Sequence, residues 1–193
     1  MKRLCVFCGS SPGADPAYAH AARKLGSILA KARIGLVYGG ASVGLMAEIA
    51  DAAMEERGEV IGVIPRSMVD MEVAHSGLTD LRIVDSMHQR KALMGDLSDG
   101  FIAMPGGLGT LEEFFEVLTW AQLGMHAKPC GLLNVGGFYD QLLAFLDHAT
   151  GQRFIKPAHR ATVLVAESPE DLLAQFEKYR APVSGKWIDR GQK

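Results

Sequence analysis

Short apolar runs alternate along this chain with longer amphipathic segments, and glycine-rich turns separate the two. The apolar runs predict β-strands over residues 4–7, 34–38, 60–64, 81–84, 100–104, 130–135 and 162–165. Apolar residues at helical spacing predict helices over residues 16–32, 43–57, 87–97, 111–123, 138–149 and 169–179, with an irregular loop over residues 67–79. Strands that alternate with helices indicate right-handed crossovers and a parallel sheet with helices on both faces. We therefore predict an α/β fold.

The length and composition fit one domain of this class. The chain has 193 residues, of which 48% are hydrophobic and 22% charged, and it contains 22 glycines. These values exclude disordered and fibrous proteins. Because no linker is visible, we expect a single domain over residues 1–181 and a polar tail over residues 182–193.

The charge and hydropathy of the chain argue against nucleic acids and membranes as its partners. The net charge is −2 and the pI about 6.3, so the basic surface of a nucleic-acid-binding protein is missing. No apolar run approaches the ~20 residues that span a bilayer. The apolar stretch near the N-terminus is also shorter than the ~7–15 residues of a signal-peptide core. We therefore expect a cytoplasmic protein that binds neither nucleic acid nor membrane.

Cys5 and Cys8 have the C-x-x-C spacing of redox and zinc sites. They lie in a predicted strand, where their side chains would point to opposite faces, whereas redox pairs stand at a helix N-terminus. Cys130 is the third and last cysteine, so no second pair completes a zinc site. We interpret the cysteines as buried apolar side chains and predict no metal site.

Three glycine-rich turns follow predicted strands, after Phe7, Tyr38 and Met104. In a parallel sheet, ligands bind beyond the carboxyl ends of the strands, so these turns mark the candidate site. The turns match neither the Walker pattern nor the G-x-G-x-x-G dinucleotide pattern.

The turn after Met104 is the strongest candidate for an anion site. Gly106, Gly107 and Gly109 would let the backbone adopt a positive φ and approach a ligand closely. Thr110 would stand where the next helix begins, and the free N–H groups and dipole of that helix attract anions. These features together predict a phosphate site.

Two pairs of charged residues accompany this turn. Glu112 and Glu113 would lie in the first helical turn, and because helix neighbours point about 100° apart, one of them is expected to face the phosphate. A carboxylate beside a phosphate is unfavourable, which indicates a role in chemistry or in binding a neutral group; compensation of the helix dipole is the alternative. Arg90 and Lys91 could supply the counter-charge, or could form a solvated cationic face.

The ordered set of motifs resembles the LOG ("Lonely Guy") family of cytokinin-activating enzymes, which are often mislabelled as lysine decarboxylases. Residues 105–113, PGGLGTLEE, resemble the family signature P-G-G-x-G-T-x-x-E, and residues 87–94 resemble a second motif that carries an Arg-Lys pair. Residues 8–11, 38–46 and 119–124 match further segments, and the resemblance extends over residues 4–179. Ala41 and Ala47 stand where glycine is usual.

The resemblance implies a Rossmann-like or flavodoxin-like fold, a homodimer whose subunits complete each other's sites, and no metal or organic cofactor. It implies hydrolysis of the N-glycosidic bond of N6-modified adenosine 5′-monophosphates to the free base and ribose 5-phosphate. Arg90 and Glu113 match the family's catalytic residues. The positions implied to bind substrate are Glu72, Lys91, Gly106, Gly107, Leu108, Gly109, Thr110, Leu111, Glu112 and Thr119.

Such a reaction passes through a transition state that resembles an oxocarbenium ion. We expect Glu113 to stabilise the sugar and orient the attacking water, and Arg90 to assist by its charge, since its pKa above ~12 makes it a poor acid. Met46, Met87 and Met94 could line a base pocket, although core packing is the favoured interpretation. A general AMP nucleosidase and a non-catalytic nucleotide sensor remain as alternatives. Lysine decarboxylation would need a lysine that binds pyridoxal phosphate, and nothing marks one out.

Overall fold

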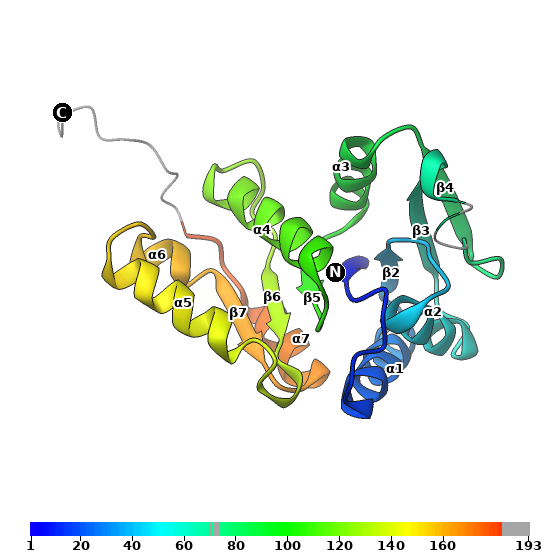
Figure 1. Cartoon of the computed structure of the whole chain (residues 1–193), viewed down its shortest axis with the longest axis horizontal. Helices are drawn as coiled ribbons and strands as arrows, with labels where there is room; N and C mark the ends of the chain where they lie inside the picture. The colour runs from blue at the N-terminus through cyan, green and yellow to red at the C-terminus, as the bar shows by residue number, and fades with distance from the viewer. Residues whose placement is uncertain (70, 72–73, 183–193) are drawn as a thin grey trace.

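The computed structural model describes residues 1–69, 71 and 74–182, which form a seven-stranded sheet between two layers of helices (Figure 1). The strands are β1 (Arg3–Phe7), β2 (Gly35–Tyr38), β3 (Val60–Pro65), β4 (Asp80–Val84), β5 (Phe101–Ala103), β6 (Cys130–Leu133) and β7 (Val163–Ala166). Their order is β4-β3-β2-β1-β5-β6-β7, and each neighbouring pair is parallel. The predicted α/β fold is confirmed.

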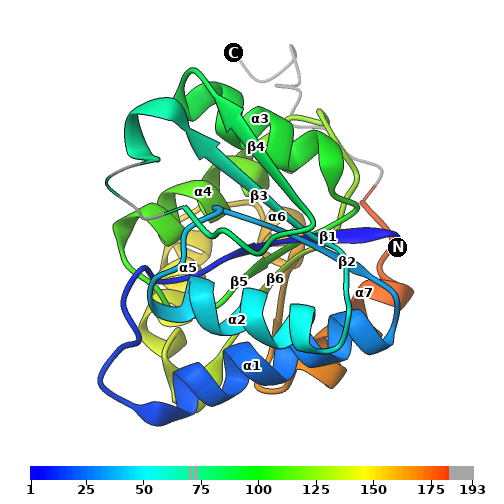
Figure 2. The same ribbon diagram turned by 90° about the vertical axis from the view of Figure 1, so that its right-hand side faces the viewer.

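The helices divide between the two faces of the sheet. They are α1 (Pro16–Lys31), α2 (Gly44–Glu55), α3 (Met87–Leu97), α4 (Leu108–Gln122), α5 (Asp140–Gly151), α6 (Pro157–Arg160) and α7 (Pro169–Lys178), with short 3-10 turns η1 (Arg66–Met68) and η2 (Val135–Gly137). Figure 2 shows α1 and α2 on one side of the sheet and α3 and α4 on the other. Two separate core clusters fill these layers, one under α1, α2 and α7 and one under α3, α4 and α5.

Local sequence signals account for where several helices begin. The Asp15 side chain caps α1 by accepting a hydrogen bond from Ala17 N at 2.8 Å. Ser86 caps α3 in the same way, accepting from Gln89 N at 3.2 Å. The beginning of α4 was predicted incorrectly: it starts at Leu108 and not at residue 111, because Gly109, which suggested a turn, lies inside the helix and Gly107 is its N-cap.

The C-x-x-C pair lies at the end of β1: Cys5 is in the strand and Cys8 directly follows its last residue. Cys5 belongs to the core cluster under α3 and α4, while Cys8 belongs to the cluster under α1 and α2, so the two side chains point to opposite faces. Burial raises the pKa of both thiols, and the Glu113 carboxylate adds to the increase. Both cysteines are therefore apolar core residues rather than reactive thiolates.

The connections of the sheet change direction between β1 and β5. From β1 the chain moves outward through β2 and β3 to β4, then returns to β5 beside β1 and continues the other way through β6 to β7. The loops after β1 and β5 therefore separate at this point, which is where open α/β sheets bind their ligands. The two loops are joined by a hydrogen bond from Gly9 N to Pro105 O at 3.1 Å.

Candidate functional site

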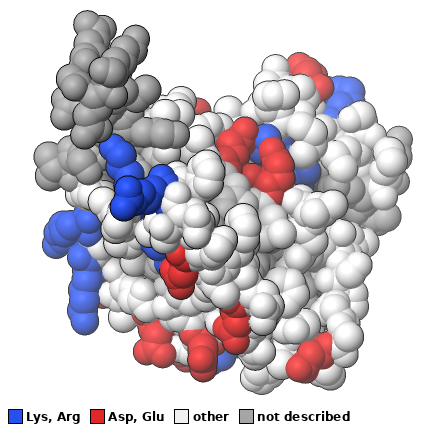
Figure 3. Space-filling view, turned by 60° about the vertical axis from the view of Figure 1, so that its left-hand side comes forward, with Lys and Arg blue, Asp and Glu red and all other residues white. Residues whose placement is uncertain are grey.

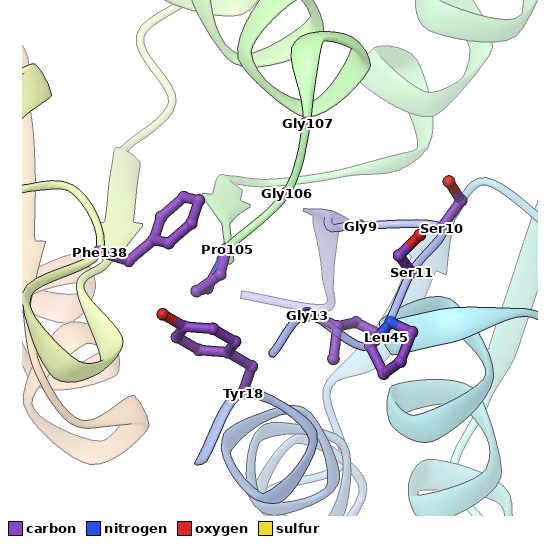
Figure 4. A pocket seen from close by; sticks show the side chains of 11 residues that line it. Gly9, Ser10, Ser11, Gly13, Tyr18, Leu45, Pro105, Gly106, Gly107 and Phe138 are labelled. Carbon is purple, nitrogen blue, oxygen red and sulfur yellow. The ribbon is translucent and has the colours of Figure 1, made fainter. Parts of the chain in front are cut away.

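Two cavities lie against the joined loops at this edge of the sheet. The first, which we call the Arg90 cavity, has a volume of about 300 Å³ and is lined by Cys8, Gly9, Ser10, Met46, Met68, Met87, Arg90, Gly107, Leu108, Gly109, Thr110, Glu112 and Glu113. The second, the Tyr18 cavity, has about 280 Å³ and is lined by Gly9, Ser10, Ser11, Pro12, Gly13, Tyr18, Leu45, Pro105, Gly106, Gly107 and Phe138 (Figure 4). Gly9, Ser10 and Gly107 belong to both.

Arg90 is a buried cation in the wall of the first cavity. It lies in the first turn of α3, and its side chain is 5% exposed. Its Nη2 donates to Gly39 O at 3.1 Å, and its Nη1 lies 3.8 Å from Met87 Sδ and 4.0 Å from Met68 Sδ. A Cβ at Gly39 would collide with Nη2. The turn after β2 therefore holds the guanidinium in place through a backbone carbonyl.

Glu113, on α4, lines the Arg90 cavity. It is half-buried, in contrast to the exposed Glu112. The pKa of the Cys5 thiol, which burial raises most, is raised further by Glu113 and lowered by Arg90, so both charges act on the same point of the core. The cavity thus has a carboxylate and a guanidinium in its wall, beside the open start of α4.

Lys91 has its charge compensated by α4. Its Nζ lies 2.5 Å from Glu112 Oε1 and 3.1 Å from Glu116 Oε1, and the side chain is only 11% exposed. Desolvation lowers the pKa of Lys91, but the hydrogen bonds to the two carboxylates outweigh it and leave the pKa above its ordinary value. Glu112 also lines the Arg90 cavity, so this ion pair stands at its edge.

The glycines at the start of α4 differ in what they contact. A Cβ at Gly106 would collide with Thr110 Oγ1, so the fold itself requires that glycine. A Cβ at Gly107 or Gly109 would meet no atom within 4 Å, although both residues line the Arg90 cavity. Gly107 is the N-cap of α4 and offers no side chain to the first N–H groups of the helix. The open side of this turn is therefore available to a ligand.

Two expectations for this turn were wrong. None of Gly106, Gly107 and Gly109 has a positive φ; Gly107 has a φ of −91°. Because α4 begins at Leu108, Glu112 and Glu113 lie in its second turn and not its first, too far along for compensation of the helix dipole to explain them.

The turn after β2 supports the site without lining it. His75 N donates to Gly40 O at 3.0 Å, and Ala41 forms an isolated bridge with Ala74, so the segment before β4 covers this turn. Gly40 has a φ of +81°, which favours glycine. Ala41, the departure from the family pattern, is fully buried here.

Among the other predicted residues, Thr119 and Leu111 lie apart from the Arg90 cavity, while Leu108 lines it. Thr119 is on α4 in a separate groove of about 90 Å³, together with Phe115, Leu118 and residues of α5 and α6. Leu111 packs against the core cluster under α4, and Leu108 is 87% exposed at the mouth of the Arg90 cavity. Glu72 and most of the predicted tail lie outside the described residues.

The methionines divide between cavity and core. Met94 is a core residue with 1% exposure, and Met46 belongs to the core cluster under α1 and α2, as the favoured packing interpretation predicts. Met46 also lines the Arg90 cavity, as does the exposed Met87, which is not a core residue. Met68 completes this apolar wall, and sequence reasoning missed it because it lies in a segment without periodicity. Tyr18 and Phe138, in the second cavity, were also missed because aromatic residues at helix starts give no signal of a ligand.

Within residues 1–69, 71 and 74–182, no three His, Cys, Asp or Glu side chains gather closely enough to hold a metal ion. In the same part of the chain, no helix combines the length and apolarity that crossing a bilayer requires.

Comparison with known proteins gives consistent matches over most of the chain. A family model described as possible lysine decarboxylase matches residues 46–176. A cytokinin riboside 5′-monophosphate phosphoribohydrolase of Rhodococcoides fascians is 51% identical over 174 residues, which cover 90% of this chain and 88% of the relative. An Arabidopsis thaliana protein of the same name is 49% identical, with 93% and 82% covered.

Solved structures with the same fold include carriers of a cofactor. The molybdenum cofactor binding protein of Rippkaea orientalis is 25% identical, with a TM-score of 0.70 over 92% of this chain and 97% of that one. The molybdenum cofactor carrier protein of Chlamydomonas reinhardtii is 21% identical, with a TM-score of 0.68 over 91% and 96%. The second likeness concerns the fold alone.

Proposed function

Since this chain belongs to the LOG family, whose curated relatives are named cytokinin riboside 5′-monophosphate phosphoribohydrolases, we propose that it hydrolyses the N-glycosidic bond of N6-modified adenosine 5′-monophosphates. The products are the free base and ribose 5-phosphate. The observation that carries this proposal is the Arg90 cavity, where a buried guanidinium and a half-buried carboxylate stand beside the open start of a helix.

The phosphate binds at the start of α4. The free N–H groups and the positive end of the helix dipole attract the anion, and the absence of a Cβ at Gly107 and Gly109 lets it approach the backbone. Binding energy from the phosphate then positions C1′ in the cavity. A strong preference for monophosphates over nucleosides follows from this arrangement.

Glu113 and Arg90 carry the chemistry. Water attacks C1′ while the bond from C1′ to the base nitrogen breaks, and the electron pair leaves with the base, which takes up a proton. The Glu113 carboxylate stabilises the positive charge on the sugar and accepts the proton of the water. The Arg90 guanidinium stabilises the negative charge that develops on the departing base.

Decarboxylation, which the family model's description suggests, does not fit these residues. That chemistry needs a lysine that forms a Schiff base with pyridoxal phosphate. Among the described residues, neither cavity is lined by a lysine, and the nearby Lys91 is bonded to two carboxylates.

The active form is a homodimer in which a second copy covers the α4–α5 side. Leu123, Met125, Phe145 and Phe154 are exposed there, beside the groove that contains Thr119. On the face that turns α5 and α6 toward the viewer, uncharged side chains cover most of the surface (Figure 3). A dimer across this side places Thr119 at an interface, which is how that residue contributes to binding.

A product assay on AMP and isopentenyl-AMP in parallel tests the proposed function. Release of free base and ribose 5-phosphate from both, with none from the nucleosides, is the expected result. Glu113→Gln should lower kcat by about 100-fold or more while calorimetry shows retained nucleotide binding. The same substitution at the exposed Glu177 serves as control. Binding of AMP without any base release would favour the sensor instead, and comparable turnover of nucleosides would refute the phosphate site.

A further inference from the structure

The Tyr18 cavity is a second, differently built space at the same edge of the sheet. Among the residues that the structure describes, its lining contains no charged side chain. Its walls are the rings of Tyr18 and Phe138, together with Pro12, Leu45 and Pro105, while the hydroxyl-bearing Ser10 and Ser11 complete the lining (Figure 4). An uncharged and largely apolar group therefore fits it.

The aromatic wall is held in place by the backbone. A Cβ at Gly13 would collide with the Tyr18 ring, so this glycine lets the ring lie against the loop after β1. The Tyr18 and Phe138 rings meet edge to face, with centroids 5.7 Å apart. Phe138 is 40% exposed, so part of its ring remains accessible to a ligand in the cavity.

The residue after Phe138 fixes its position. Tyr139 N donates to Asn134 Oδ1 at 2.7 Å, and the Tyr139 hydroxyl donates to Met104 O at 2.5 Å. Positive φ angles of 58° at Gly136 and 74° at Gly137 form the turn that presents the Phe138 ring. Buried hydrogen bonds therefore hold the Phe138 side of the aromatic wall in place before any ligand binds.

The two cavities meet at the phosphate site. Gly9, Ser10 and Gly107 line both of them, so an anion at the start of α4 has the Arg90 cavity on one side and the Tyr18 cavity on the other. The nucleoside of a 5′-monophosphate occupies one side only. At least one of the three non-ester oxygens of such a phosphate would then face the uncharged Tyr18 cavity.

We propose that the Tyr18 cavity binds a planar, uncharged ring attached to the far side of the ligand's phosphate, so that the chain binds nucleoside 5′-phosphodiesters as well as monophosphates. The proposal rests on the proposed function in that it takes the phosphate to lie at the start of α4. Because the Tyr18 and Phe138 rings are nearly perpendicular, the bound ring stacks on one of them and meets the other edge to face, and its polar edge reaches the hydroxyls of Ser10 and Ser11. Aryl phosphodiesters carry the ring directly on the phosphate, and dinucleotides carry a second base on this side of the phosphate through a ribose.

Two esters of AMP test the proposal, the phenyl and the methyl phosphodiester. The two esters carry the same charge and differ only in the ester group, which is an aromatic ring in one and a methyl group in the other. Dissociation constants are measured by calorimetry on the full chain with Glu113→Gln, so that turnover does not interfere. The phenyl ester should bind about tenfold more tightly than the methyl ester. When Phe138→Ala is added to this variant, the ratio of the two dissociation constants should fall to about one. When Phe138→Leu is added instead, part of the ratio should remain.

Each other outcome overturns the proposal. Equal affinities for the two esters, or a ratio that survives Phe138→Ala in a variant with unchanged thermal stability, would mean that the ring does not enter the cavity. A tenfold weaker affinity for AMP itself in Phe138→Ala would mean that the substrate's own base lies there. Failure of the proposed function is a separate result, because it is the absence of base release from AMP by the unmodified chain.

Discussion

The Nζ of Lys91 on α3 lies 3.1 Å from Oε1 of Glu116 on α4, and this contact joins the two helices that carry the candidate catalytic pair. Arg90 precedes Lys91, and Glu113 is one helical turn before Glu116. The ion pair is largely shielded from water, with Lys91 11% and Glu116 26% exposed. It therefore fixes how α3 lies against α4, and with it the relation of the guanidinium to the carboxylate.

Glu116→Gln should lower kcat with little change in KM. The substitution keeps the shape of the side chain but removes the less exposed of the two carboxylate charges that hold Lys91, so the relation of Arg90 to Glu113 becomes less fixed; we expect kcat to fall about tenfold. Steady-state kinetics on isopentenyl-AMP measure both parameters. If Lys91 acts instead as a phosphate ligand, Lys91→Met will raise KM for the monophosphate while Glu116→Gln will not change kcat.

Gly39→Ala should reduce kcat/KM about 100-fold, because a methyl group at this position takes the place of Arg90 Nη2. The hydrogen bond to Gly39 O would break and the guanidinium would leave the cavity wall. Gly151→Ala is the matched control, since a Cβ there meets no atom within 4 Å. Full activity of the Gly39→Ala protein would mean that the position of Arg90 does not matter for turnover.

Gly109→Ala should stabilise the protein and weaken substrate binding at once. The residue lies in the first turn of α4 and an added Cβ meets nothing, so the gain in helix propensity is about 0.5–1 kcal/mol. The same methyl group projects toward the proposed phosphate position, and KM should rise about tenfold. Thermal unfolding and steady-state kinetics measure the two effects. An unchanged KM would contradict the phosphate site at this turn.

The layered fold could be predicted because its signals are local. Buried parallel strands are continuous apolar runs, and Asp15 and Ser86 are side chains that begin helices. The start of α4 was misplaced because glycine has low helix propensity, yet here the helix is stabilised by packing of Phe114 and Val117 in the core.

The candidate site was only partly predictable. The turn after Met104 and the residues Arg90 and Glu113 were identified from motifs. The pairing of Lys91 with Glu116 was not, because it depends on how two helices pack against each other, which no local pattern encodes. Met68 was missed for the same reason: it enters the cavity from an irregular segment whose position is set by tertiary contacts.

Met87→Gln should shift the preference of the enzyme from modified to plain AMP. Met46, Met68 and Met87 give the Arg90 cavity an apolar, adaptable wall, and a polar amide at position 87 would remove part of it. We expect kcat/KM for isopentenyl-AMP relative to AMP to fall about tenfold. Met87→Leu, which keeps the wall apolar, should preserve the ratio. An unchanged ratio in Met87→Gln would place the base modification elsewhere.

Phe154→Asp should break the proposed homodimer and abolish most turnover with it. Phe154, which follows α5, is 89% exposed on the α4–α5 side, and in a symmetric interface the substitution would bury two charges, which should weaken association about 100-fold or more. Sedimentation measures the mass of the protein in solution. Ile83→Asp, at an exposed apolar position on β4, should leave the dimer intact. A wild-type monomer that retains full activity would show instead that one chain completes its own site and that Thr119 has no part in it.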